Sequence, residues 1–210
     1  MPSLEVIEKT ENRISIKFKD VPLPYANAIR RICLNGIPVF AIDRISVRDN
    51  SSVMADEALA HRLGLIPLKT DLTEFKDIRD VDASSDSNKI MLILDVKEST
   101  TTRTVLSGDL VSEDAYVKPV SADIPLVILA PGQRVVVDAY ARLGRGIEHA
   151  KWNSSNIAAL TETDVEGERI LTVESTGALP PEQIVISAIK ELSNRISDFK
   201  DLVGKMSGSD

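Results

Sequence analysis

Residues 22–36 read Pro-Leu-Pro-Tyr-Ala-Asn-Ala-Ile-Arg-Arg-Ile-Cys-Leu-Asn-Gly. Proline at the start, glycine at the end and Pro38 just beyond are typical of the two ends of a helix. The apolar positions recur with helical spacing and form one wide stripe: Tyr25, Ala26, Ile29, Ile32 and Cys33. Arg30 and Arg31 lie beside that stripe. The stretch therefore predicts a helix that packs on its own domain, with two guanidinium groups that either stay solvated or contact another protein.

The composition is that of a globular protein with an acidic balance. The chain has 210 residues, 43% of them hydrophobic and 4% aromatic, so aliphatic side chains must form the core of one large or two small domains. The formal net charge of −7 argues against a basic face that binds nucleic acid directly. No apolar run approaches the roughly 20 residues that cross a bilayer, and no basic-then-apolar leader opens the chain. We therefore expect a cytoplasmic protein without membrane contact.

Alternating patterns predict strands around the first helix and through the middle of the chain. Residues 4–10 and 13–19 predict a hairpin, and residues 39–47 predict a third strand, so the first part reads β-β-α-β up to the turn residues 49–52. A short helix at residues 56–64 and an acidic loop at 71–88 follow. The remaining pattern predicts strands at 90–97, 100–106, 126–129 and 134–143, a polar linker at 153–168, and a last strand at 168–176.

The final helix, which begins near Pro181, carries a long apolar seam. Its members step by four and three alternately: Val185, Ile189, Leu192, Ile196, Phe199 and Val203. Ile184 and Ala188 widen the stripe, so one side can lie on a sheet while the other meets a partner. Burying each large apolar side chain is worth roughly 1.5–3 kcal/mol, so an uncovered seam would be a costly exposed patch.

Four stretches, in order along the chain, resemble the signatures of one protein family. They lie at residues 24–43, 56–69, 144–152 and 170–192, and include Asn27-Ala-Ile-Arg-Arg-Ile-Cys-Leu34, Ala60-His-Arg-Leu-Gly-Leu-Ile-Pro-Leu68, Gly144-Arg-Gly146 with Glu148-His-Ala-Lys-Trp152, and Thr172-Val-Glu-Ser-Thr-Gly-Ala-Leu-Pro-Pro-Glu182. The chain is similar there to the alpha-type assembly subunits of multisubunit RNA polymerases. That family includes the bacterial alpha N-terminal domain, its archaeal counterpart and the eukaryotic third-largest subunit, and we expect the archaeal branch.

The resemblance implies a fold and a role. The fold would be α+β, with a discontinuous dimerisation domain at residues 1–49 and 156–210 and an inserted, mostly β domain at 50–155. The role would be that of a non-catalytic scaffold that pairs with the small subunit L and docks the second-largest subunit, with the small subunits N and P nearby.

The resemblance also implies two sets of contact residues. For subunit L they are Tyr25, Ile29, Ile32, Ile189, Leu192, Ile196 and Phe199. For the large or small assembly subunits they are Asn27, Arg30, Arg31, Arg145, His149, Lys151 and Trp152.

Cofactors are not expected. Some relatives carry a cysteine cluster for zinc or an inserted iron–sulfur site, whereas Cys33 is the only cysteine of this chain and falls within the apolar stripe. One thiol can form neither a four-thiolate cluster nor an internal disulfide.

Two other readings stay open. An enzyme could use His61, His149 and nearby carboxylates, although no His-x-x-x-His spacing, paired His and Cys or phosphate loop supports it. A self-sufficient homodimer, as in the bacterial relative, would use the same apolar stripes without subunit L. Solubility of the chain with and without a partner would discriminate between these readings.

Overall fold

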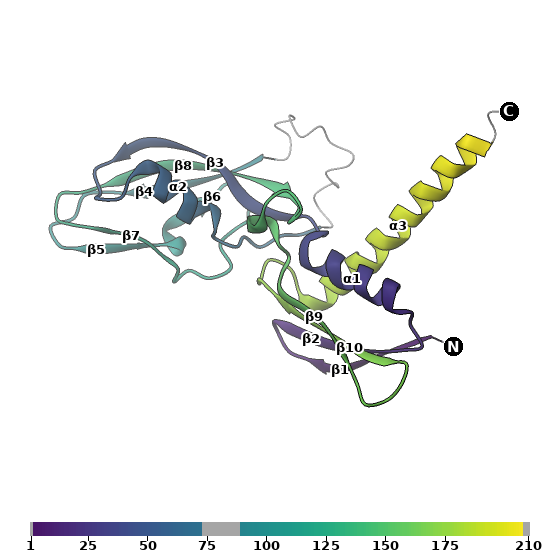
Figure 1. Ribbon diagram of the computed structural model, residues 1–210. Coiled ribbons are helices and arrows are strands. Elements are labelled where there is room, and N and C mark those ends of the chain that lie inside the picture. Colours follow the sequence, from purple (N-terminus) through teal and green to yellow (C-terminus); the bar gives the residue numbers. More distant parts are fainter. Residues whose placement is uncertain (1, 73–88, 208–210) are drawn as a thin grey trace. The chain divides into compact units, whose positions relative to one another are not determined.

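The computed structural model describes residues 2–72 and 89–207 (Figure 1). Residues 73–88 of the expected acidic loop lie outside that description. The elements follow in the order β1 Ser3–Lys9, β2 Arg13–Lys19, α1 Leu23–Asn35, β3 Val39–Asn50, α2 Asp56–Gly64, β4 Lys89–Val96, β5 Arg103–Leu106, η3 Ser107–Asp109, β6 Leu110–Ser112, β7 Pro125–Leu129, β8 Val135–Gly144, η4 Ala150–Trp152, β9 Ser155–Glu162, β10 Glu168–Ser175 and α3 Pro181–Ser207. This mixture of helices and antiparallel sheets confirms the α+β class.

The chain divides into two compact units. The first unit joins Met1–Ile37 to Arg145–Asp210, and the second unit is Pro38–Gly144. The sequence placed these divisions after residues 49 and 155, so the structure moves each of them by about a dozen residues toward the N-terminus. The reason is that β3 is part of the second unit, where its first residues are already buried.

The first unit is a four-stranded antiparallel sheet with two helices on one face. The strand order is β1-β2-β10-β9, and α1 and α3 contact each other as well as the sheet (Figure 1). Strand alternation turns one face of β2 and β10 towards the helices. The buried apolar side chains between the sheet and the two helices include Ile14, Ile16, Phe18, Ala26, Ile29, Ile32, Cys33, Leu171, Val173, Ile184, Val185 and Ala188.

The second unit has two sheets and one short helix. Its sheets run β3-β8-β4-β6 and β5-β7, and α2 contacts both β3 and β7. The stretch Ala60–Leu68 supplies several fully buried side chains to this core, so that signature has a packing role: Leu63, Ile66 and Leu68. Val39 lies opposite Gly144 in the register of β3 and β8. Opposed residues of antiparallel strands are about 5 Å apart, so the unit begins and ends at nearly the same point.

Two segments differ from the sequence expectation. Residues 39–47 were expected as the third strand of the first domain, but β3 pairs with β8 and its Phe40 and Ile42 enter the core of the second unit. Residues 153–168 were expected as a polar linker, but they contain β9, which pairs with β10 along its whole length. The side chains of β9 are mostly exposed. Because backbone pairing rather than apolar alternation defines this edge strand, its sequence carried little signal.

No helix among the described residues is long and apolar enough to span a membrane.

Candidate functional site

The second half of α3 is not packed against the described residues of its own unit. Within the helix, Ile184, Val185 and Ala188 are buried, whereas the residues from Ser193 to Met206 are all exposed. Exposed apolar side chains continue the three-and-four spacing of the core side: Ile189, Ile196, Phe199, Val203 and Met206. The same stripe therefore serves the core of the unit at one end and faces solvent at the other.

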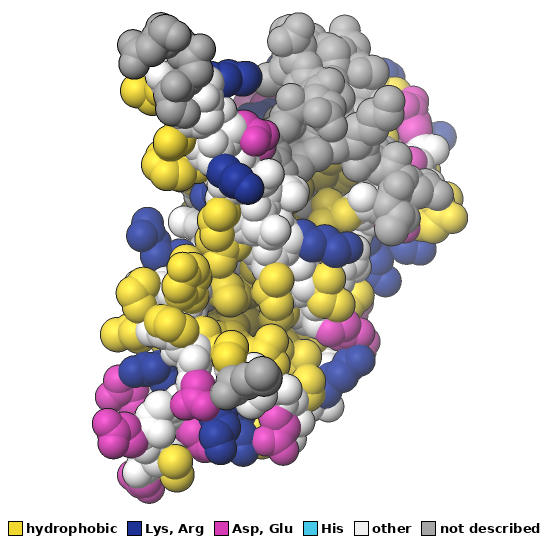
Figure 2. All heavy atoms as spheres, turned by 90° about the vertical axis from the view of Figure 1, so that its right-hand side faces the viewer, with side chains coloured by type: hydrophobic (Ala, Val, Ile, Leu, Met, Phe, Trp, Pro, Cys, Tyr) yellow, Lys and Arg dark blue, Asp and Glu magenta, His cyan; other side chains and the backbone are white. Residues whose placement is uncertain are grey.

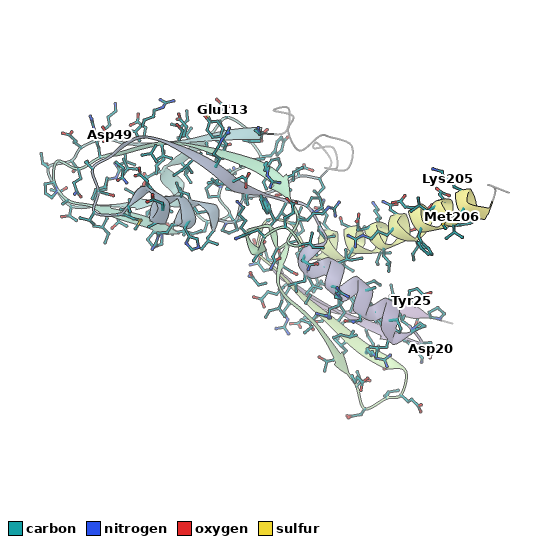
Figure 3. The ribbon with its side chains drawn as sticks, turned by 45° about the horizontal axis from the view of Figure 1, so that its top comes forward. Asp20, Tyr25, Asp49, Glu113, Lys205 and Met206 are labelled. Carbon is teal, nitrogen blue, oxygen red and sulfur yellow. The ribbon has the colours of Figure 1, made fainter. Side chains whose placement is uncertain are left out.

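Hydrophobic side chains gather where this helix leaves its sheet. Figure 2 shows them between α3 and the sheet and along α3 towards its end. On α1, Leu23 and Tyr25 are about half exposed, and Figure 3 shows Tyr25 near the N-terminal end of α1 and Met206 in the last turns of α3. An exposed apolar surface of this kind, on a helix with polar residues around the rest of its circumference, is typical of a protein interface.

Two residues that the sequence assigned to this surface lie elsewhere. Ile29 and Ile32 are buried within the first unit, where they fix α1 on its sheet. With 9% and 6% of their surface exposed, they offer a partner little area, so we correct that part of the assignment and leave them out of the pairing surface. Leu192 is half-buried, at the boundary between the covered and the uncovered parts of α3.

Arg30 and Arg31 have different surroundings. The Arg30 guanidinium donates to Asn27 Oδ1 over 2.9 Å and to the backbone oxygen of Ala158 in β9 over 3.3 Å. Arg31 is exposed, and among the described residues its side chain has no hydrogen bond or ion pair. Arg30 therefore ties α1 to the sheet edge, whereas Arg31 presents its five N–H donors to the outside.

The loop from Arg145 to Ser155 closes the C-terminal end of α1. The last carbonyls of a helix lack intrahelical donors. Here the hydroxyls of Ser154 and Ser155 each donate to the carbonyl of Cys33 over 2.8 Å, and the backbone N–H of Ile147 donates to that of Asn35 over 3.3 Å. The loop is thus held to the helix by buried hydrogen bonds and has a fixed position within the unit.

Arg145 completes this closure through a charge network. Its guanidinium donates to the carbonyl of Gly36 and lies 3.5 Å from Glu191 Oε1 on α3. Glu191 is 8% exposed and also accepts from Arg195 over 2.8 Å. Arg145, which the sequence offered as a contact residue, therefore joins the end of α1 to α3 inside the unit.

The remaining predicted loop residues form a small aromatic cluster. Trp152 is buried, the Lys151 ammonium lies 4.3 Å from its ring centroid, and the His149 ring meets it edge-on at 6.4 Å. His149 Nδ1 accepts from the backbone N–H of Lys151 over 3.1 Å. Trp152 is thus a core residue rather than a contact residue, whereas His149 remains exposed on the loop surface.

The structure adds exposed apolar residues that sequence reasoning missed. Ile147 is 77% exposed on the fixed loop, and Leu202 and Met206 extend the surface of α3. Continuing the seam by three residues beyond Val203 would have found Met206. A single isoleucine in a glycine-containing loop has no periodicity, so nothing in the sequence could have identified Ile147.

The two histidines and the single cysteine were the residues of interest for catalytic or metal chemistry. His61 is exposed on α2 in the second unit, and His149 belongs to the first unit. No group of three or more His, Cys, Asp or Glu side chains within residues 2–72 and 89–207 could hold a metal ion. Burial raises the pKa of the Cys33 thiol to about 12, so it stays protonated at neutral pH.

Comparison with known proteins identifies the chain's relatives. Residues 44–165 match the model of the RNA polymerase Rpb3/RpoA insert domain. A protein of Pyrococcus horikoshii, DNA-directed RNA polymerase subunit Rpo3, is 44% identical over 72% of this chain and 56% of its own length. The subunit of the same name from Pyrococcus furiosus is 36% identical over 96% of this chain and 79% of its own length.

A third relative extends the likeness to nearly the whole of both sequences. The Rpo3 subunit of Aeropyrum pernix is 31% identical over 96% of this chain and 95% of its own length. These matches confirm the resemblance that the four signatures indicated. The chain therefore belongs to the family of archaeal DNA-directed RNA polymerase subunits called Rpo3.

Proposed function

We propose that this chain is a non-catalytic assembly subunit of a multisubunit DNA-directed RNA polymerase. In this proposal it pairs with the small subunit L and then docks the second-largest subunit, with the small subunits N and P as neighbours. It contacts no nucleic acid itself, and the active site of the complex lies on the large subunits. The exposed apolar stripe on the second half of α3 is the observation that carries the pairing step.

The pairing surface consists of the apolar side chains that the first unit leaves uncovered. On α3 these are Ile189, Ile196, Phe199, Leu202, Val203 and Met206, with half-buried Leu192 at the boundary. Leu23 and Tyr25 add the exposed end of α1. Each large side chain that a partner covers contributes roughly 1.5–3 kcal/mol, so a few of them can supply most of the association energy.

The docking surface is proposed at the opposite end of α1 and on the loop that closes it. Arg31 supplies an exposed guanidinium, and Ile147 and His149 project from a loop fixed by buried hydrogen bonds. Arginine is among the residue types that dominate interfaces, and a rigid support lowers the entropy cost of binding. Asn27 and Arg30 support this surface, because Arg30 donates hydrogen bonds both to Asn27 and to the backbone of β9.

A charge placed in the stripe tests the pairing step. In Ile196→Asp, association would bury an unpaired carboxylate, so we expect the heterodimer with subunit L to be lost in gel filtration of the co-expressed pair. Ser197→Asp puts the same charge on the next exposed residue of the same turn and serves as the matched control. A normal heterodimer in Ile196→Asp would refute the proposed surface, and so would equal loss in both variants.

A homodimer is the competing outcome of the same experiment. Expressed without subunit L, the chain should aggregate or self-associate, and co-expression with L should give a soluble one-to-one complex. A stable homodimer that subunit L fails to displace would favour the self-sufficient reading instead.

A further inference from the structure

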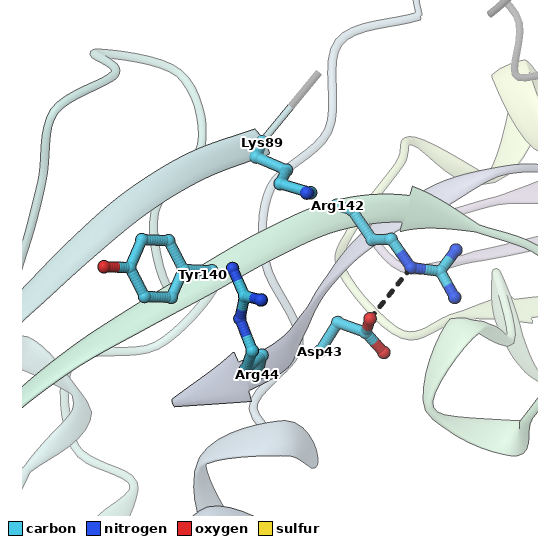
Figure 4. A pocket seen from close by; sticks show the side chains of 5 residues that line it. All are labelled: Asp43, Arg44, Lys89, Tyr140 and Arg142. Atoms are coloured by element: carbon cyan, nitrogen blue, oxygen red, sulfur yellow. Dashed lines mark hydrogen bonds and ion pairs between the residues drawn. The ribbon is translucent and has the colours of Figure 1, made fainter. Parts of the chain in front are cut away.

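The outer face of the larger sheet in the second unit holds a small cavity. It measures about 170 Å³, and five side chains line it: Asp43, Arg44, Lys89, Tyr140 and Arg142 (Figure 4). They come from the neighbouring strands β3, β8 and β4, and the register sets Arg44 opposite Tyr140 and Lys89 opposite Arg142. Because the alternate residues Ala139 and Ala141 are buried in the core, this row faces away from it.

Cationic side chains predominate among the residues that line this cavity. Three of the lining side chains are cations and one is a carboxylate. Asp43 Oδ2 accepts a hydrogen bond from Arg142 Nε over 3.0 Å. In the described part of the chain no carboxylate pairs with Arg44, whose guanidinium carbon lies 5.2 Å from the centroid of the Tyr140 ring. This cation–π contact uses the face of the guanidinium and leaves the N–H donors in its plane for another acceptor.

We propose that this cavity, the Arg44 pocket, binds the carboxylate of an aspartate or glutamate side chain from an acidic segment of another protein. The planar fork of Arg44 matches the two oxygens of a carboxylate. Tyr140 orients that fork from the neighbouring strand, and Lys89 and Arg142 add positive potential around it (Figure 4). The inference goes beyond assembly, because none of these residues belongs to the proposed pairing or docking surface.

Size and charge favour a protein carboxylate over a phosphate. A cavity of about 170 Å³ is smaller than the roughly 300–1,000 Å³ of typical small-molecule sites, and it suits one side chain. Asp43, one of the lining side chains, would repel a dianion more strongly than a monoanion. The net charge of −7 also disfavours the approach of a polyanion such as DNA, whereas a short acidic segment carries less charge.

Peptide binding to the full-length chain, in the assembly in which it is isolated, tests the proposal. The probe is a fluorescein-labelled hexaglutamate peptide, followed by fluorescence anisotropy at about 20 mM salt, where screening is weak. We expect saturable binding that hexaglutamine does not reproduce. Arg44→Gln should weaken it about fivefold or more. Arg103→Gln, which removes another surface arginine of the same unit, should change it less than about twofold.

Two further variants separate a binding role from a structural one. Tyr140→Leu should weaken hexaglutamate binding while Tyr140→Phe preserves it, because the ring face orients Arg44. Asp43→Asn should strengthen binding, because it removes the competing carboxylate, and a merely structural role would not predict a gain.

Four results would overturn the proposal. The first is the absence of saturable hexaglutamate binding, and the second is equal binding by Arg44→Gln and the wild-type chain. The third is weaker or unchanged binding in Asp43→Asn. The fourth is displacement of the peptide by inorganic phosphate or an oligothymidylate at a lower concentration than by free hexaglutamate. The last result would reassign the pocket to phosphate.

Discussion

Arg30 and Arg31 are adjacent in the sequence, but the helix turns their side chains to different surroundings. Arg30 bonds to Asn27 and to the backbone of Ala158, whereas Arg31 is exposed. Replacing Arg30 by alanine removes hydrogen bonds within the chain. Replacing Arg31 by alanine removes only the contacts that Arg31 makes with another protein. The two substitutions should therefore have separate effects.

Arg31→Ala should leave pairing with subunit L intact and weaken capture of the second-largest subunit about tenfold or more, because a guanidinium hydrogen-bonded across an interface contributes about 1.5–3 kcal/mol. A pull-down with the immobilised heterodimer measures this effect. Arg13→Ala, an exposed arginine of β2, is the control and should have no effect. Unchanged capture by Arg31→Ala would remove Arg31 from the docking surface.

Alanine substitutions at Gly146 and Gly204 test the close contact between the loop and α1, because Gly146 lies at that contact and Gly204 does not. A Cβ at Gly146 would lie 2.8 Å from Asn35 Cα and would also collide with Asn153 Oδ1, whereas one at Gly204 would meet nothing within 4 Å. We expect Gly146→Ala to lower the free energy of unfolding by about 1–3 kcal/mol because the backbones must separate. Gly204→Ala should be neutral or stabilise α3 by at most about 1 kcal/mol. Urea unfolding would measure both, and equal effects would contradict the close packing.

At the scale of elements, α3 is one helix with two environments. Its 27 residues span about 40 Å, but only the half near Pro181 is packed on the sheet. An isolated helix of about 14 residues is marginal in water. We therefore expect the second half to be less stable than the first and to gain stability when a partner covers its apolar stripe.

Amide hydrogen exchange should report these two halves separately. In the unpaired chain, residues 193–206 should exchange with little protection while residues 184–192 are protected. Adding subunit L should slow exchange in 193–206 at least about tenfold, because covering the stripe suppresses local opening, and the first half serves as the internal control. Strong protection of both halves before pairing would show that α3 needs no cover.

At the scale of the whole molecule, the second unit has the features of an independent domain. Its large apolar core is formed entirely by residues between Phe40 and Leu143, and its first and last strands lie side by side. The chain leaves and re-enters the first unit at Ile37 and Arg145. An inserted domain with adjacent ends costs the surrounding unit little chain entropy.

Residues 38–144 expressed alone should therefore unfold in one cooperative urea transition. Leu94, which is fully buried in this core, supplies the check. Leu94→Ala should lower the free energy of unfolding by about 2–5 kcal/mol in the isolated unit, as a cavity in a packed core does. A non-cooperative transition, or no effect of Leu94→Ala, would mean that the unit does not form this core by itself.

Periodicity in the sequence indicated which segments are helical and where most of the strands lie. The sequence predicted α1 within one residue at each end and α2 at its observed bounds, because proline, glycine and helical spacing act locally. It also placed Cys33 in the core and the apolar seam on the last helix. Four ordered signatures were enough to indicate the family.

Only the tertiary structure decided which apolar and charged residues face outward. Ile29 and Ile196 look alike in a helical pattern, yet the sheet covers the first and not the second. Arg145 was expected at an interface but is held by Glu191, a partner 46 positions away, and β9 exists because β10 offers it a paired edge. Burial of a helix face, formation of an ion pair and pairing of an edge strand all depend on segments that are distant in the sequence. A local pattern therefore specifies whether a segment is a helix or a strand, but not which segments pack against it.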